Sequence, residues 1–189
     1  MQVFISRASK RRTKILTVRK GTLPDTEQIL SFQQAMALET EGIVLEENVL
    51  REGITQVFHS LDKGFYLVAE ENHRLVGSLL ITYEWSDWRN ATFWWIQSVF
   101  VAPKWRRKGV YRSLHQYLLQ MIDSQGDICG IRLYVERSNA VAQQTYKELG
   151  MTPSHYDLYE IDFPKNILPK RYQNNTGSDS DRSENTPHT

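Results

Sequence analysis

A basic turn separates a strand-like segment from a helix-like segment in the middle of the chain. The stretch VFVAPKWRRKGVYRSL, residues 99–114, passes through a proline into Arg106, Arg107, Lys108 and Gly109. Helix N-termini expose unpaired backbone N–H groups and a partial positive charge, and a glycine there lets an anion approach the main chain. Basic residues in a first helical turn oppose the helix macrodipole, which favours a bound pyrophosphate. A solvated turn closed by glycine is the plainer alternative.

A second group of residues follows about thirty positions later in the sequence. The stretch NAVAQQTYKELG, residues 139–150, places Asn139, Ala142, Tyr146 and Gly150 on one helix that ends at the glycine. Asn139 and Tyr146 are about two helical turns apart, so their side chains project from one face. An N-cap role for Asn139 and a core position for Tyr146 would explain the same spacing without chemistry.

Both groups resemble signatures of the GNAT superfamily of N-acetyltransferases. The run from Arg106 to Tyr111 is similar to the acetyl-CoA motif Arg/Gln-x-x-Gly-x-Gly/Ala, and five of its six positions are compatible. The departure is Tyr111, where the family usually has Gly or Ala. The segment that begins at Asn139 resembles the motif Asn-x-x-Ala-x-x-x-Tyr-x-x-x-Gly. The resemblance covers roughly residues 15–163, and its specific part is confined to residues 99–150.

The resemblance implies an acetyl-CoA-dependent N-acetyltransferase that acts on a primary amine, with a small molecule as the expected acceptor. It implies Tyr146 as the general acid that protonates the leaving thiolate, with Asn139 and Gln97 as further catalytic residues. A backbone N–H from the strand at residues 97–101 would stabilise charge on the thioester oxygen. The implied cofactor-binding residues are Val99, Phe100, Val101, Arg106, Arg107, Lys108, Gly109, Val110, Tyr111, Arg112, Asn139, Ala142 and Tyr146.

Proton transfer needs further groups, because an alkyl ammonium has a pKa near ~10.4 and must lose a proton before attack. Gln97 is an amide that could position a water but would be a poor base. His115 lies off the apolar stripe of its helix, and neither it nor His155 is assigned a role. No group of side chains has metal-ligand spacing and the G-x-S-x-G nucleophile signature is missing, so we expect no metal and direct transfer in a ternary complex.

The acceptor site is expected near two unusual stretches. YEWSDWRNATFWWIQSV is dense in tryptophan beside carboxylates, which suits a cationic amine, and MALETEGIVLEEN is acidic. Aromatics covering two faces of a sheet, and a solvated acidic loop, are the alternatives. The expected substrate-binding residues are Glu39, Glu41, Glu84, Trp85, Trp94 and Trp95.

The elements that would position these residues form an α/β (α+β) pattern. Periodicity predicts the order β-α-α-β-β-β-α-β-α-β. The resemblance implies the GNAT fold, in which about four helices flank a mixed, mostly antiparallel sheet of six or seven strands. The expected elements are strands at 15–19, 65–69, 75–83, 92–101, 131–135 and 156–161, and helices that begin near residues 24, 46, 110 and 138.

Bulk properties narrow the class. The 189 residues suit one domain, predicted at 13–165 between a basic extension at 1–12 and a disordered tail at 166–189. The net charge of +1 and the lack of a long apolar run predict no nucleic-acid or membrane partner. The single cysteine suits a reducing compartment and hence the cytoplasm, although the basic extension would also suit an organelle transit peptide.

Alternatives to a small-molecule enzyme remain on the sequence alone. A protein or peptide acetyltransferase would need an open groove for an extended chain, and a non-catalytic acyl-CoA sensor would need no thiolate acid. Exposed edge strands in this kind of fold favour pairing into a homodimer.

Overall fold

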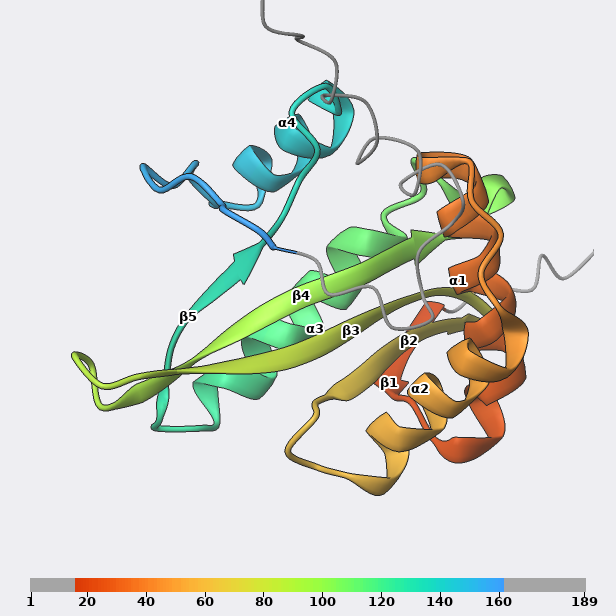
Figure 1. Ribbon diagram of the computed structural model, residues 1–189, viewed down its shortest axis with the longest axis horizontal. Helices are drawn as coiled ribbons and strands as arrows, with labels where there is room; N and C mark the ends of the chain where they lie inside the picture. Colours follow the sequence, from red (N-terminus) through yellow and green to blue (C-terminus); the bar gives the residue numbers. More distant parts are fainter. Residues whose placement is uncertain (1–15, 162–189) are drawn as a thin grey trace, which may run out of the picture.

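A computed structural model describes residues 16–161, which form one five-stranded mixed sheet with four α-helices (Figure 1). The predicted mixed α/β fold is confirmed. The elements in chain order are β1 (Leu16–Lys20), a 3-10 turn η1 (Leu23–Asp25), α1 (Thr26–Glu41), α2 (Glu47–His59), β2 (Phe65–Glu71), β3 (Arg74–Ser86), β4 (Ala91–Val101), a 3-10 turn η2 (Pro103–Trp105), α3 (Val110–Asp123), β5 (Ile128–Leu133) and α4 (Ala140–Glu148).

The sheet has the strand order β1-β2-β3-β4-β5. The first four strands pair antiparallel with their neighbours, whereas β5 lies parallel to β4. A parallel partner needs a crossover connection, and α3 supplies it between β4 and β5. The predicted run of three consecutive antiparallel strands is therefore present as β2, β3 and β4.

The predicted final strand is wrong for the part of the chain that the structure describes. Residues 156–161 have no strand assignment, and the side chains of Tyr156, Tyr159 and Ile161 are exposed. The sheet consequently has five strands within residues 16–161 instead of six or seven. Alternating apolar residues indicate a strand only where a neighbouring strand accepts their backbone hydrogen bonds, and none within those residues does so here.

Helices cover both faces of the sheet, and each face has its own core (Figure 1). On one face, Leu114 and Leu118 of α3 pack against buried strand residues such as Leu67 and Ile81. On the other face, Ile29 of α1 and Ile54 of α2 pack against Tyr66 and Val68 of β2. Successive residues of β2 thus point to opposite cores, as the period of two in a strand requires.

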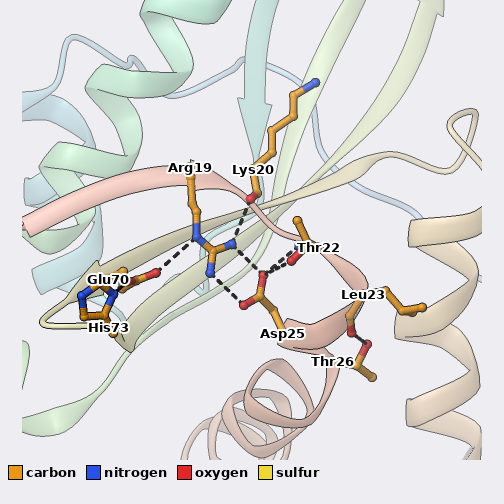
Figure 2. Close-up of polar contacts among 8 residues, drawn as sticks. All are labelled: Arg19, Lys20, Thr22, Leu23, Asp25, Thr26, Glu70 and His73. Atoms are coloured by element: carbon orange, nitrogen blue, oxygen red, sulfur yellow. Dashed lines mark hydrogen bonds and ion pairs between the residues drawn. The ribbon is translucent and has the colours of Figure 1, made fainter.

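An arginine in β1 fastens the start of α1 to the sheet (Figure 2). The Arg19 guanidinium donates two hydrogen bonds to the Asp25 carboxylate, at 2.7 and 2.9 Å, and a third to Glu70 of β2 at 3.2 Å. Asp25 also accepts from the backbone N–H of Thr22 at 2.8 Å. Because of these hydrogen bonds, that from Arg19 above all, the pKa of Asp25 lies below its ordinary value.

Gly77 of β3 allows α3 to approach the sheet closely at its first turn. A Cβ at Gly77 would lie 2.9 Å from the Phe100 carbonyl oxygen and 3.0 Å from a methyl group of Val110. Any larger residue would push the start of α3 away from β3. The absence of a side chain at Gly77 therefore allows the short distance between the first turn of α3 and the sheet.

Several predictions concern residues outside the described range. The basic extension at 1–12, the domain limits at 13 and 165 and the tail at 166–189 all lie outside residues 16–161. Within the described part, none of the helices is long and apolar enough to cross a membrane.

Candidate functional site

The strand β4 continues past the end of β5, and the two chain segments diverge there and form a fork (Figure 1). Their pairing ends at Ile96 opposite Leu133, although β4 continues to Val101. Beyond that point the β5-facing edge of β4 has no strand partner among the described residues. A cleft of about 260 Å³ occupies the fork and is lined by Met36, Ile96, Gln97, Ser98, Val99, Leu133, Tyr134 and Tyr146.

A β-bulge distorts β4 at the fork. The register between β3 and β4 shifts between the pairs Leu80–Gln97 and Ser78–Phe100, and Ser98 has a φ of 51°. A positive φ is uncommon for serine and turns the local peptide groups away from the regular ladder. The bulge therefore changes the direction of main-chain groups where β4 faces the cleft.

The basic turn has the backbone shape of an anion-binding site. Gly109 is the N-cap of α3 with a φ of 80°, and Arg107 also lies in the left-handed region with a φ of 61°. The first backbone bond of the helix runs from Ser113 N–H to the Gly109 carbonyl at 2.9 Å, so the N–H groups of residues 110–112 precede it and have no intrahelical acceptor. No atom lies within 4 Å of a Cβ built on Gly109, so the approach to this turn is open.

The basic side chains of the turn differ in their contacts. The Arg106 guanidinium donates two hydrogen bonds of 2.6 Å to the Glu39 carboxylate on α1 and one of 3.0 Å to the Val101 carbonyl. The hydrogen bonds from Arg106 lower the pKa of the Glu39 carboxyl below its ordinary value. Lys108 lies 4.9 Å from the centre of the Trp105 ring, and Arg112 reaches Glu148 of α4 at 3.7 Å. Arg106 thus links the turn to α1 instead of extending toward an anion.

Tyr146 projects from α4 into the cleft of the fork. Its ring meets the ring of Tyr111 edge-on, with the two centroids 5.5 Å apart. Burial raises the pKa of Tyr146 above its ordinary value. Its phenol therefore remains protonated at neutral pH, which is the state that a proton donor requires.

A second cavity lies on the α1 and α2 side of the sheet. It measures about 310 Å³, and residues of α2 and of the segment before it form much of its lining. Gln33 of α1, Tyr66 of β2 and Leu80 of β3 complete the lining together with Ser98. Ser98 also lines the cleft in the fork, so the two cavities share the bulge residue in their linings.

Comparison with known proteins decides the family. Residues 29–151 match the model of the acetyltransferase (GNAT) family, which is more than half of the chain. The chain belongs to the GNAT family of acetyltransferases. Membership supports acetyl transfer that depends on acyl-CoA, and it confirms the resemblance seen in the sequence. A search of curated proteins found no match.

Solved structures agree with this GNAT assignment. A protein described as a possible acetyltransferase from Clostridium difficile 630 has 38% sequence identity, a TM-score of 0.74 and coverage of 79% of this chain and 99% of its own. An aminoglycoside N-acetyltransferase solved with CoA has 12% identity and a TM-score of 0.67, with 80% and 97% of the two chains covered. A ribosomal-protein-alanine N-acetyltransferase from Brucella melitensis has 15% identity and a TM-score of 0.65, with 79% and 100% covered. At these low identities the last two share the fold.

The residues expected to bind the acceptor do not line either cavity. Trp94 is 3% exposed and belongs to the core on the α3 side of the sheet. Trp85 is 61% exposed near the β3–β4 hairpin, and Trp95 stacks on Tyr134 with ring centroids 4.4 Å apart. Aromatic coverage of the sheet, the plainer interpretation, accounts for Trp94 and Trp95. The other three residues of the predicted acceptor set, Glu39, Glu41 and Glu84, also lie outside both cavity linings.

Three further residues from the sequence analysis have defined surroundings in this GNAT protein. His115 is 3% exposed and lies near Tyr111, one turn earlier on α3, so its placement off the buried stripe is wrong. Burial lowers the pKa of His115, and the imidazole is neutral at neutral pH. Asn139 accepts a hydrogen bond from Ala142 N–H at 3.0 Å and is therefore the N-cap of α4. The Gln97 amide donates to the Thr82 hydroxyl at 2.6 Å.

Sequence reasoning missed most of the residues that line the cavities, and three of them show why. Ser98 carries the bulge, but serine has no strong preference for a positive φ that would have revealed it. Gln33 lies on the buried side of α1, where a polar residue one helical turn from the apolar Ile29 and Ala37 was the available signal. Tyr134 lines the cleft as the first residue after the end of β5.

Proposed function

We propose that this protein transfers the acetyl group of acetyl-CoA to a primary amine of a small molecule, in a ternary complex. The observation that carries the proposal is that two cavities share Ser98 in their linings, one in the fork with Tyr146 and one under α2. Acetyl transfer requires two binding sites that share one point of contact, and the bulge of β4 provides such a point.

The residues present fit acetyl-CoA at both ends. The open N-terminus of α3 with Gly109 suits a pyrophosphate, and Arg107, Lys108 and Arg112 are the basic side chains around it. The free edge of β4 from Gln97 to Val101 offers main-chain groups to the amide-bearing arm of the cofactor. When bound, acetyl-CoA supplies an acetyl group activated as a thioester.

The chain's own residues then have separable tasks. Backbone N–H groups at the bulge hold the developing charge on the acetyl oxygen, because a preorganised donor stabilises that charge more than water does. Tyr146 donates its phenolic proton to the leaving sulfur. Gln97, anchored by Thr82, orients a water that takes the proton from the amine. Nothing in this scheme requires a covalent intermediate on the protein.

Initial rates of thiol release, measured while both acetyl-CoA and the amine are varied, test this scheme. Direct transfer predicts intersecting double-reciprocal lines, whereas parallel lines would indicate a covalent acetyl-enzyme and contradict it. Acetylation of peptides alone, with no free amine accepted, would instead favour a protein acetyltransferase. Binding of acetyl-CoA without any transfer would favour a sensor.

A glycine pair provides a matched control for the cofactor site. Gly109→Val introduces a β-branched residue at a φ of 80°, which should distort the turn and raise the KM for acetyl-CoA by about tenfold or more. Gly126→Val lies in the loop after α3, where a Cβ meets no atom within 4 Å and φ is not in the left-handed region, so its KM should match the wild type. Equal KM values for both variants would contradict the phosphate site.

A further inference from the structure

The cavity under α2 has an unusually apolar wall for a site that would receive an amine. Six of its lining side chains are aliphatic, namely Leu45, Val49, Leu50, Ile54, Val57 and Leu80. The volume of about 310 Å³ is near the lower end of the range for small-ligand pockets, roughly 300–1,000 Å³. An apolar group of moderate size would displace water from this wall.

Two carboxylates of the expected acceptor set, and the one carboxylate in the lining of this cavity, already have partners of the opposite charge or polarity. Glu39 is held by Arg106, and Glu84 is held by Arg132 at 2.6 Å and by the indole N–H of Trp95. Glu46 borders the cavity, but its carboxylate accepts from the N–H groups of residues 48 and 49 at the start of α2. These bonded carboxylates would have to exchange their present partners in order to hold a polycation.

A buried amide without a partner lies in the same wall. Gln33 is 5% exposed and lines the cavity, and its Nε2 has no hydrogen-bond partner among the described residues. Leaving a buried donor unpaired is costly, and the terminal torsion of glutamine is soft enough to turn the donor toward a ligand. Tyr66 contributes a neutral phenol to the lining, since burial raises its pKa to about 12.

We propose that the acceptor is a primary amine with an apolar body, which fills this cavity, and a neutral oxygen, which accepts a hydrogen bond from Gln33. The proposal rests on the proposed acetyltransferase function and names its substrate class. The amine nitrogen reaches the acetyl carbon at the bulge of Ser98. A C–N bond forms there and the C–S bond breaks, the amine proton leaves to water, and the thiolate takes the proton of Tyr146. Tyr146 then regains a proton from water, so that the products are an acetamide and free CoA.

Paired amines test the substrate class directly. Leucinamide and phenylalaninamide carry a carbonyl oxygen that isopentylamine and phenethylamine lack, and spermidine represents the polycations. With kcat/KM expressed on the concentration of the unprotonated amine, because the α-amine of an amide has a lower pKa than an alkyl amine, each amino-acid amide should exceed its matched amine by about tenfold or more, with spermidine lowest. A preference for spermidine, or equal values within both matched pairs, would overturn the substrate class while leaving the acetyltransferase function intact. Failure of all five amines would contradict the function itself and the inference with it.

Two variants assign the preference to the cavity. Gln33→Leu keeps the size of the side chain and removes the amide, so the ratio of kcat/KM between each matched pair should fall to near one through a higher KM for the amino-acid amide. Val49→Glu places a charge at the exposed rim and should lower kcat/KM for both apolar amines by about tenfold. Leu61→Glu is the matched control, exposed and outside the lining, and should leave both values unchanged. An unaltered ratio in Gln33→Leu, with acetyl-CoA affinity retained, would overturn the role of Gln33.

Discussion

The ring of Tyr111 at the start of α3 meets the ring of Tyr146 on α4 edge-on, at a centroid distance of 5.5 Å. Tyr111 occupies the position at which GNAT proteins usually have glycine or alanine. Its ring contacts the core beside α3, and the phenolic oxygen is buried without a hydrogen-bond partner among the described residues. Tyr111 thus packs against the proposed general acid and joins the start of α3 to α4.

The Tyr111–Tyr146 contact predicts different results for two substitutions of Tyr111. Tyr111→Phe keeps the ring and removes an unsatisfied hydroxyl, so the free energy of unfolding should stay the same or rise by about 1 kcal/mol. Tyr111→Ala leaves a cavity beneath Tyr146 and should cost about 3–5 kcal/mol and lower kcat. Urea unfolding and steady-state rates measure both effects. A loss of kcat in Tyr111→Phe with stability retained would mean that the hydroxyl takes part in the reaction.

Tyr146→Phe should lower kcat by about a hundredfold or more and leave acetyl-CoA affinity nearly unchanged, because the variant lacks only the proton donor. Burial raises the pKa of Tyr146, and a donor is active while protonated. The kcat of the wild type should therefore hold through neutral pH and fall only when the pH rises above about 10, the ordinary tyrosine pKa. A pH profile of kcat checks this. An alkaline fall that persists unchanged in Tyr146→Phe would belong to another group.

The pair of Glu39 and Arg106 predicts an effect on cofactor binding that is shared by both partners. If Arg106 acts by fixing the turn to α1, then Glu39→Gln and Arg106→Gln should each weaken acetyl-CoA binding by about two- to fivefold, since such exposed pairs contribute little. The double variant should be no weaker than either single one. Calorimetric titration measures all three affinities. Unchanged or tighter binding in Glu39→Gln, beside a clear loss in Arg106→Gln, would show that the guanidinium binds phosphate itself.

The lowered pKa of Asp25 predicts that the free energy of unfolding depends on pH. Its hydrogen bonds, that from Arg19 above all, lower its pKa in the folded state below the unfolded value, so its contribution is present above about pH 4 and is lost as the pH falls through the folded pKa. Asp25→Asn should cost about 1–3 kcal/mol at neutral pH and flatten the acid limb of the stability curve.

Glu47→Gln is the control: it removes an exposed partner of Arg51 and should change stability by less than about 0.5 kcal/mol. Denaturant unfolding between pH 3 and 7, taken as about the titration range of a carboxyl, tests the pair. An equal acid dependence in Asp25→Asn and the wild type would contradict the assignment.

Local sequence signals predicted the parts of the fold that depend on local rules. Gly109 and Gly150 mark the start of α3 and the end of α4 with positive φ values, and Asn139 is a standard N-cap. The periodicity of α3 placed Leu114 and Leu118 in the core. These features depend on a few neighbouring residues, which is why a single sequence contains them.

The features that depend on distant contacts were not predictable from the sequence. The Arg106–Glu39 pair joins residues 67 positions apart, and the partner of a surface arginine has no local signature. The bulge at Ser98 arises from the register between β3 and β4, and the cavity beside Gln33 arises from the packing of α1 and α2 on the sheet. The density of tryptophan in β3 and β4 suggested an acceptor site. In the structure, Trp94 instead belongs to the core between the sheet and α3.

Simultaneous quantification of free CoA thiol and acetylated amine, with leucinamide or phenylalaninamide as the acceptor, tests the central claim most directly. The account predicts that the wild-type protein forms the two products in equal amounts and that Tyr146→Phe forms both far more slowly. Thiol release without acetylated amine, or no product from either acceptor by a protein that binds acetyl-CoA, would contradict acetyl transfer at the bulge of Ser98.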